Sequence, residues 1–339
     1  MELTGLDLGG SSLKCVTIKK ETKELLALAY SPAPGVSLES ESQTDLENYA
    51  KFLRAFVESQ SQPINFVSVS LPESKIFNRI MTLPKMPAKE LQGAVTFEAE
   101  QYLPLPLKDV IYDFKVIEEL EEGKKQNVLL VAAPKELIAK YSQIITKANL
   151  TLVGLEPETA ALARSVVDTA PSPMATLVVS LGDKSTDLTI VYGGVVRFTR
   201  SIGTGGAALT RAITQALGFE PKQAEEYKKT YGLDETQLEG KIAKCLLPVF
   251  ELIVQEIRLD LAYYQTHETN SPALKRLILC GGTSQLPGAL VYLASALNLE
   301  AQLANPWLKV KNSHQISSRE LEEAGPVYAV AVGLALKDI

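Results

Sequence analysis

The amino-acid sequence predicts an α/β protein made of two related domains. With 339 residues the chain exceeds the length of one ordinary domain core. Short apolar runs typical of strands alternate with longer segments whose apolar residues recur at helical spacing. The segment GLDLGGSSLKCVTI at 5–18 also aligns with VVSLGDKSTDLTIV at 178–191, each with the pattern strand, turn, strand. This weak internal repeat indicates that a second domain begins where the pattern starts again.

The first half of the chain is expected to open with a hairpin and to continue with helices and strands. Residues 3–18 carry a Gly-Gly-Ser-Ser turn between two β-rich runs. Apolar residues at helical spacing predict a helix over 43–58, and the following INFVSVSLP is expected to be a buried strand. Prolines bracket a predicted helix from Lys89 to Tyr102. Two strands, VIYDFKVI and QNVLLVAA, and a helix over 135–149 complete an inserted β/α unit.

The second half repeats this opening and ends in helices. GLEPETAALARSVV is expected to be helical, and a PSP linker at 171–173 leads to two strands, TLVVSLG and DLTIVY. A polar helical block over 207–245 and a long helix over 247–266 follow. Residues 277–294 predict a strand, a Gly-Gly turn and a helix, and PVYAVAVGLALK predicts a C-terminal helix of small residues.

Composition excludes several classes of function. The net charge of −6 provides no basic field for nucleic acid or for direct binding to an anionic membrane. Cys15, Cys245 and Cys280 lie far apart in apolar surroundings, as expected of reduced thiols in the cytoplasm. His267 and His314 are too few for a histidine-based metal or triad site. No apolar stretch reaches membrane-spanning length and no signal sequence is evident, so we expect neither export nor direct anchoring.

Three glycine-containing turns, each after a predicted strand, are the candidate ligand site. A phosphate group needs backbone amides and hydroxyl donors close to it, and no Walker sequence supplies them here. In the first turn the glycines would expose amides, the serines would donate hydroxyls, Lys14 would supply a charge, and Asp7 would hold hydrated Mg²⁺. The alternative for this turn alone, a plain hairpin with a solvated aspartate, is equally favoured. The residues concerned are Asp7, Gly9, Gly10, Ser11, Ser12 and Lys14.

The second turn runs from Gly182 through Asp183, Lys184 and Ser185 to Thr186, and the third contains Gly281, Gly282, Thr283 and Ser284. A diglycine between a strand and a helix lets a phosphate or sugar approach the backbone near the positive helix end. Taken alone, the third turn is better explained by close helix packing. The three turns in this order favour one nucleotide site.

Longer segments carry a family resemblance that covers nearly the whole chain. The sequence resembles the PilM family of type IV pilus assembly proteins and, more distantly, FtsA, within the actin, sugar kinase and heat-shock chaperone superfamily. The segments are LDLGGSSLK, FEAEQYLPLPLKDVIYDF, GLEPETAALAR, SIGTGGAALTRAI, AEEYKKTYG, LCGGTSQLPGALVYL, LANPW and AVAVGLALK.

The resemblance implies a two-domain actin-like (ribonuclease H-like) ATPase fold with an FtsA-type inserted subdomain. The first domain would comprise 1–83 and 156–173, interrupted by the insertion at 84–155. The second would comprise 174–206 and 247–325, with a small nucleotide-side subdomain at 207–246. A C-terminal helix at 326–339 would pack on the first domain.

The same resemblance implies a site for ATP or ADP with Mg²⁺. It assigns the first two turns to phosphate, Gly205 and Gly206 to the loop beside the nucleotide, and the third turn to adenosine. Glu225 and Lys228 would face ribose and base, with an ordinary charged helix face as the alternative. No catalytic residue is assigned with assurance, Asp7 being the one candidate.

Ser180 departs from the family pattern, which has an aspartate at the start of the second phosphate loop. A hydroxyl does not replace a carboxylate at a divalent cation, and Asp183 would need a different turn to take over. We therefore expect nucleotide binding with weak or no hydrolysis, so whether the chain is an enzyme stays open.

The implied role is that of a cytoplasmic ATP-binding component of the inner-membrane platform of a type IV pilus. The partner would be the N-terminal cytoplasmic peptide of a PilN-like membrane protein, which would recruit the chain to the membrane. The helix from Lys89 to Tyr102 and the strand VIYDFKVI would form its groove, unless they only fill the insertion's own core. Self-association and contact with pilus motor components are further options. The alternatives are a filament-forming FtsA-like protein and a sugar or acid kinase using Glu73 as base.

Overall fold

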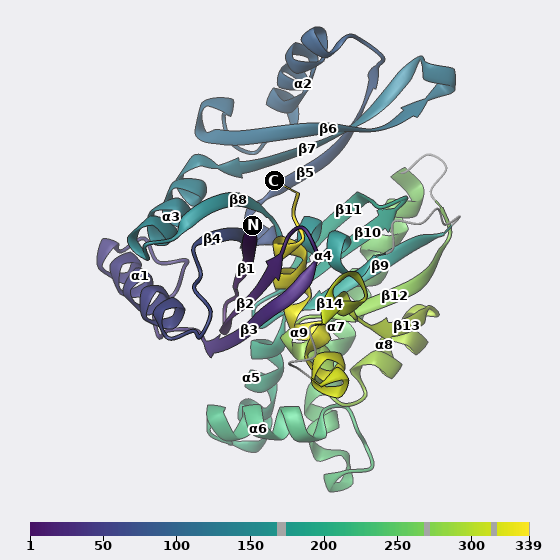
Figure 1. Cartoon of the computed structure of the whole chain (residues 1–339). Coiled ribbons are helices and arrows are strands. Elements are labelled where there is room, and N and C mark those ends of the chain that lie inside the picture. Colours follow the sequence, from purple (N-terminus) through teal and green to yellow (C-terminus); the bar gives the residue numbers. More distant parts are fainter. Residues whose placement is uncertain (168–173, 268–271, 313–316, 339) are drawn as a thin grey trace.

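The computed structural model describes residues 1–167, 174–267, 272–312 and 317–338. The strands of these residues form three sheets, and helices cover their faces (Figure 1). The expected α/β class with two domains is confirmed. The PSP linker at 171–173 and His314 lie outside the described residues.

The first domain is built on a six-stranded sheet with the order β14-β3-β2-β1-β4-β8. Its strands are β1 (Glu2–Leu8), β2 (Ser12–Lys19), β3 (Glu24–Pro32), β4 (Phe66–Leu71), β8 (Thr151–Pro157) and β14 (Lys311–Asn312). β1 and β2 form the predicted hairpin, with Leu8 opposite Leu13. Helices α1 (Gln43–Glu58) and α3 (Lys135–Lys147), both as predicted, pack against each other and share a core with this sheet.

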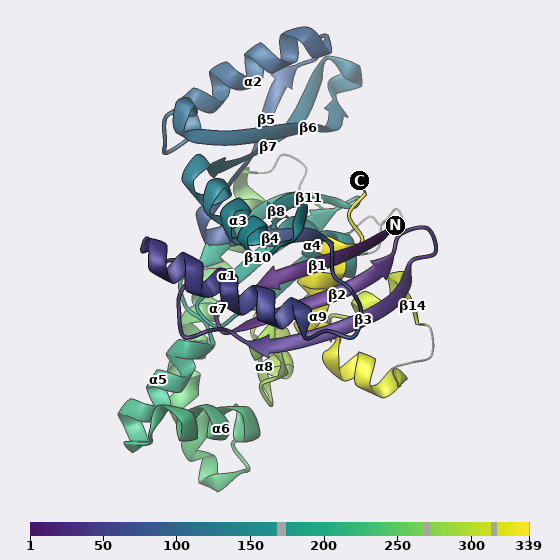
Figure 2. The ribbon, with the colours of Figure 1, turned by 60° about the vertical axis from the view of Figure 1, so that its left-hand side comes forward.

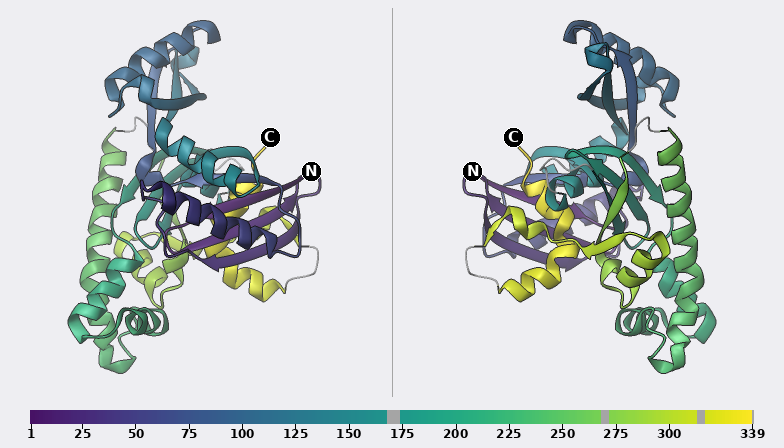
Figure 3. Two further views of the ribbon diagram at one scale, coloured as in Figure 1. Left: turned by 90° about the vertical axis from the view of Figure 1, so that its left-hand side faces the viewer. Right: turned by 90° about the vertical axis from the view of Figure 1, so that its right-hand side faces the viewer.

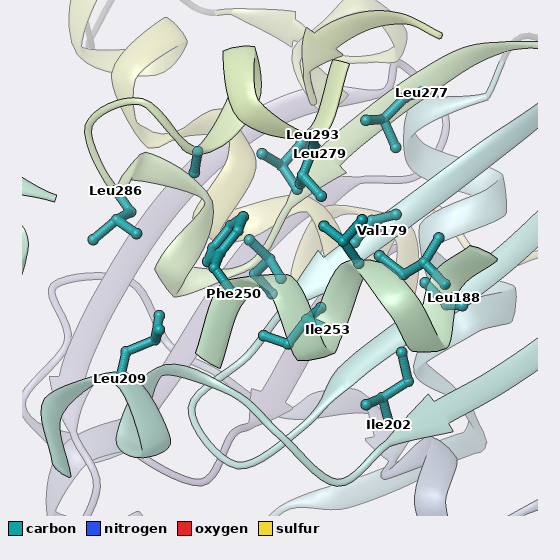
Figure 4. Close-up of a cluster of buried hydrophobic side chains, with 14 of the residues drawn as sticks. Val179, Leu188, Ile202, Leu209, Phe250, Ile253, Leu277, Leu279, Leu286 and Leu293 are labelled. Carbon is teal, nitrogen blue, oxygen red and sulfur yellow. The ribbon is translucent and has the colours of Figure 1, made fainter. Parts of the chain in front are cut away.

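The second domain is built on a five-stranded sheet with the order β11-β10-β9-β12-β13. Its strands are β9 (Ala175–Leu181), β10 (Thr186–Tyr192), β11 (Val195–Ile202), β12 (Leu274–Cys280) and β13 (Glu300–Leu303). Its helices are α5 (Gly206–Leu217), α6 (Pro221–Tyr231), α7 (Lys241–His267) and α8 (Ala289–Leu297). Helix α7 begins before the predicted residue 247, with Pro248 inside it, and runs along one side of the molecule (Figure 3). Phe250 and Ile253 of α7 pack onto Val179 and Leu188 of the sheet (Figure 4).

The inserted unit projects from one end of the molecule, opposite α5 and α6 (Figure 2). It is a three-stranded sheet, β5 (Phe77–Pro84), β7 (Lys125–Pro134) and β6 (Val110–Leu120), with α2 (Ala88–Tyr102) on one face. The expected range of the insertion, 84–155, differs from these limits. β5 belongs to the inserted sheet, whereas α3 and β8 belong with the first domain, since β8 pairs with β4. We therefore propose 77–134 as the inserted subdomain.

Two helices lie against each other between the main domains: α4 (Glu158–Val166) and α9 (Ser318–Ala335). A Cβ added at Gly333 would lie 1.9 Å from the carbonyl oxygen of Ala161, so this contact requires a residue without a side chain. GLEPETAALARSVV was expected to be helical throughout, but its first residues complete β8, because Pro157 ends the strand and precedes the first turn of α4. Helix α9 also starts earlier than expected, at a capping box formed by Ser317 and Glu320.

The cysteines and the helix lengths bear on the expectations from composition. Cys15, Cys245 and Cys280 are free thiols; the first and last are buried, while Cys245 is only partly buried. Among the helices of the described residues, none combines the length and apolar character needed to span a bilayer.

Candidate functional site

A large cleft of about 1840 Å³ lies between the two main domains, and all three glycine turns reach it. Each turn follows the carboxyl end of a strand, which brings turns from both sheets to one place. Most of the predicted site residues line the cleft: Asp7, Gly9, Gly10, Ser11, Ser12, Lys14, Gly182, Asp183, Ser185, Glu225, Lys228, Gly281, Gly282 and Thr283. The exceptions, Thr186, Gly205, Gly206 and Ser284, do not line it.

These four residues support the walls of the cleft. The Gly206 amide donates to the Gly182 carbonyl (2.9 Å), as the Thr283 hydroxyl also does (3.0 Å). A Cβ added at Gly205 would lie 2.7 Å from the Asp183 carbonyl oxygen, so α5 starts tightly against the second turn. The hydroxyls of Thr186 and Ser284 donate to backbone carbonyls.

The first hairpin holds a buried ion pair. Lys14 Nζ donates to Asp7 Oδ2 at 2.9 Å, and the two residues face each other across β1 and β2. Both side chains are at most a tenth exposed. Asp7 therefore has a cation from the chain itself, and within the described part of the chain no three His, Cys, Asp or Glu side chains are placed to hold a metal ion directly.

In the second hairpin, formed by β9 and β10, the carboxylate is that of Asp187 and lies on the outgoing strand. Ser180 faces Asp187 across β9 and β10. The hydroxyls of Ser185 and Ser201 donate to Asp187 at 3.0 and 2.5 Å. Burial raises the pKa of Asp187, against the effect of these two hydrogen bonds. Asp187 was missed from the sequence, although counting outward from the turn would have paired it with Ser180.

Two buried glutamates add carboxyl groups to the cleft. Glu73 follows β4 in the short helical turn Glu73–Lys75, where Asn78 and Thr159 each donate to it at 2.8 Å. Burial raises its pKa to about 6, opposed by hydrogen bonds and assisted by the charge of Asp187. Each oxygen of Glu73 therefore accepts one hydrogen bond from the chain itself.

Glu158, the first residue of α4, was also missed from the sequence. Burial and the charges of Asp7 and Asp187 raise its pKa, and Lys14 opposes this shift. Asp7, Glu73, Glu158 and Asp187 thus line the cleft with four carboxyl groups, of which Asp7 is paired with Lys14. Such an excess of carboxyl groups suits a ligand that arrives with a cation.

Glu225 and Lys228 of α6 form an ion pair, and Lys228 also connects α6 to α5. Lys228 Nζ lies 2.6 Å from Glu225 Oε2 and donates to the carbonyl of Gly206 (3.0 Å) and the hydroxyl of Thr210 (2.9 Å). Partial burial raises the pKa of Glu225, but hydrogen bonds from Lys228 and Thr210 outweigh it, so the net shift is downward. Lys228 is buried, so it does not belong to an ordinary solvated helix face.

The third turn differs from the expectation in one respect. Gly281 has φ +89° and a Cβ there would lie 2.4 Å from the Leu181 carbonyl oxygen, so only glycine fits. The diglycine does not open a long helix, however. Gly282–Gln285 form a short 3₁₀ turn, and α8 starts at Ala289, so the N-terminus of α8 does not lie at the diglycine.

Comparison with known proteins gives consistent results. A family model described as "Type IV pilus assembly protein PilM" matches residues 5–339. A solved structure of the PilM-PilN type IV pilus biogenesis complex superposes with a TM-score of 0.88 and 29% identity, covering 100% of this chain and 99% of that one. MreB5 of Spiroplasma citri bound to AMPPNP superposes with a TM-score of 0.54 and 14% identity, covering 98% and 94%, which supports the actin-like fold alone.

A more distant relative is the cell division protein FtsA of Streptococcus pneumoniae serotype 2 (strain D39 / NCTC 7466). It is 20% identical over 254 residues, which cover 68% of this chain. The match spans only about half of that relative, 55% of its length.

Proposed function

This chain belongs to the type IV pilus assembly protein PilM family, and we propose that it binds ATP or ADP in the cleft between its two domains. The observation that supports this most is the convergence of three glycine turns, from two separate sheets, on one cleft. Backbone amides and serine hydroxyls of the first two turns would hold the phosphates. Gly281 and Gly282 would let the adenosine approach the backbone, with Glu225 and Lys228 beside the sugar and base.

Magnesium would neutralise phosphate charge in this site. We propose that Asp7 holds it through water, because Asp7 is paired with Lys14 and the residues that the structure describes offer no group of three His, Cys, Asp or Glu side chains to bind a metal directly. Asp187 faces the same cleft and adds a second carboxyl group. Since Ser180 stands where the family has an aspartate, we expect hydrolysis to be weak or absent.

Calorimetry with a non-hydrolysable ATP analogue and Mg²⁺ tests nucleotide binding. Lys228→Ala should lower the affinity by about tenfold or more, because it removes a buried charge that joins α5 and α6 at the cleft. The neighbouring Lys229→Ala is the control, since that side chain is 71% exposed and contacts the same Glu225. Absence of binding by the wild-type chain would refute the proposed site.

We further propose that the inserted subdomain binds the N-terminal peptide of a PilN-like membrane protein and so brings the chain to the inner face of the membrane. β6 is at the edge of its sheet and can add an extended peptide through its backbone. Apolar side chains on this unit are exposed, with Phe97 65% and Ile111 48% accessible. The related solved complex pairs PilM with PilN, which supports this partner.

The partner is tested with a fluorescent peptide of the PilN-like N-terminus. Ile111→Lys should weaken peptide binding at least tenfold, because it places a charge beside the open edge of β6. Leu259→Lys is the matched control, since Leu259 is likewise an exposed apolar residue, 65% accessible, but lies on α7 of the second domain. Equal binding by both variants would reject the inserted subdomain as the receptor.

A further inference from the structure

Three alternate residues of β11 face three different parts of the molecule. We call Arg197, Thr199 and Ser201 the β11 row. Thr199 and Ser201 lie on one side because side chains of a strand alternate. The pairing of β10 with β11 skips Arg197, so its place is given by its contacts. Ser201 donates to Asp187 of the second hairpin (2.5 Å). Thr199 accepts from Asn78 of β5 (3.3 Å), and Arg197 donates to Glu118 of β6 (2.7 Å). The row therefore begins at the nucleotide cleft and ends at the inserted subdomain.

At the far end of the row the arginine is shielded from water, while its partner Glu118 is 37% exposed. The Arg197 side chain is 9% exposed, and its guanidinium lies 5.6 Å from the centre of the Tyr192 ring. Glu118 also accepts from Asn127 of β7, which in turn accepts from Thr82 of β5. One arginine of the second domain thus reaches a polar network that includes all three strands of the inserted sheet. Breaking a shielded pair costs more than breaking an exposed one.

The middle of the row is connected to Glu73, which lines the cleft, through Asn78. Asn78 Nδ2, which donates to Thr199, also donates to Glu73 at 2.8 Å. Glu73 accepts from Thr159 of α4, one of the two helices between the domains. The inserted subdomain, helix α4 and the second hairpin are therefore connected through residues of β11.

From these contacts we infer that the β11 row makes nucleotide occupancy and the position of the inserted subdomain depend on each other. The inference rests on the proposed nucleotide site. The contacts of Arg197 and Thr199 exist only while the inserted sheet lies against β11. A nucleotide held by turns of both domains would favour the domain arrangement of this structure, in which these contacts form. By linkage, a ligand that stabilises the same position of the inserted subdomain would favour nucleotide binding.

Hydrogen exchange measured by mass spectrometry tests this inference on the full chain. A saturating non-hydrolysable ATP analogue with Mg²⁺ should slow exchange of the β5 and β6 amides by about tenfold in the wild-type protein. Arg197→Ala should lose most of that protection while still binding nucleotide. Arg200→Ala is the control, because Arg200 lies on the opposite face of the same strand, 65% exposed and 3.6 Å from Asp260.

A second variant keeps the test decisive if Arg197→Ala folds poorly. Glu118→Gln preserves the shape of the pair and removes its charge, and it should also lose protection. If calorimetry detects no nucleotide binding to the wild type, the proposed function fails, and this inference fails with it. If nucleotide binds but the exchange of β5 and β6 does not change, or the protection persists in both Arg197→Ala and Glu118→Gln, the β11 row is not the coupling element.

Discussion

The two hairpins that enter the cleft have the same backbone and opposite arrangements of charge. A Cβ added at Gly9 would lie 3.0 Å from the Ser12 carbonyl oxygen, and one at Gly182 would lie 2.9 Å from that of Ser185. In the first hairpin the carboxylate is on the incoming strand, and Lys14 on the outgoing strand pairs with it.

In the second hairpin Ser180 is on the incoming strand, and Asp187 on the outgoing strand is held by two hydroxyls with no lysine opposite. An internal repeat can therefore preserve the turn while its carboxylate changes from the incoming strand to the outgoing strand. A residue-by-residue alignment of the repeat finds a lost aspartate at Ser180, whereas the cross-strand register finds a carboxyl group at Asp187.

The largest expected effect is a difference in the free energy of unfolding between variants of Asp7 and of Asp187. Asp7→Asn should lower the free energy of unfolding by about 3 kcal/mol, because it leaves the buried Lys14 ammonium without its counter-charge. Asp187→Asn should leave stability unchanged or raise it, because burial already raises the pKa of Asp187 and so opposes its ionised form. Urea denaturation of both variants measures the difference. Equal losses would mean that the hairpins are not electrostatically distinct.

The next effect uses pH to examine the buried carboxyl group of Glu73. The pKa of Glu73 is raised from 4.5 to about 6, so ionising Glu73 opposes the folded state. Its contribution is favourable below pH 4.5 and is lost as the pH rises to about 6, which lowers the free energy of unfolding by about 2 kcal/mol. Glu73→Gln should remove this pH dependence and be more stable at pH 7.

Urea denaturation between pH 4 and 7 measures the contribution of Glu73. Glu226→Gln, an exposed carboxylate on α6, is the control and should follow the wild-type pH profile. If Glu73→Gln also retained that profile, the buried carboxyl group would not be its source.

Ser180→Asp tests whether the second hairpin needs a carboxylate on its incoming strand. Directly opposite Asp187, the new carboxylate should destabilise the ligand-free protein, since like charges on facing residues repel. With Mg²⁺ and ATP it should raise hydrolysis about tenfold, equivalent to about 1.4 kcal/mol in the barrier. Ser180→Asn introduces a side chain of the same shape as aspartate without its charge. It should neither destabilise the ligand-free protein nor raise hydrolysis. Equal hydrolysis by both variants, or ordinary enzyme rates in the wild type, would remove Ser180 as the reason for weak activity.

Local signals made most of the fold predictable. The first hairpin follows from a Gly-rich turn between β-rich runs, and α1 follows from apolar residues at helical spacing. Six strands were not predicted: β3, β5, β8, β11, β13 and β14. β3 is only partly buried and lacks a clean alternation, and β8 ends in residues whose composition favours a helix. Their pairing partners lie elsewhere in the chain, so tertiary contacts decide them.

The candidate site was predictable as three turns but not as a charge arrangement. Glycine and serine are recognisable in a turn. The importance of Glu158 and Asp187, by contrast, depends on where the starts of α4 and β10 lie in the folded chain. Lys228 is a similar case, because its burial against α5 is a tertiary property that a polar helix sequence conceals.

The smallest expected effect concerns Lys184, the lysine in the turn of the second hairpin. Lys184 Nζ lies 3.2 Å from Glu39 Oε1 across the cleft, with the two side chains 50% and 64% exposed, whereas the Lys14 pair is buried. Lys184→Ala should therefore change the free energy of unfolding by less than about 1 kcal/mol, because water and salt screen an exposed pair. Combining it with Glu39→Gln in a double-mutant cycle at low and high salt isolates the pair. A coupling as large as the loss in Asp7→Asn, or one insensitive to salt, would show that the second hairpin also depends on a strong lysine contact and that the contrast between the hairpins is smaller than their geometry indicates.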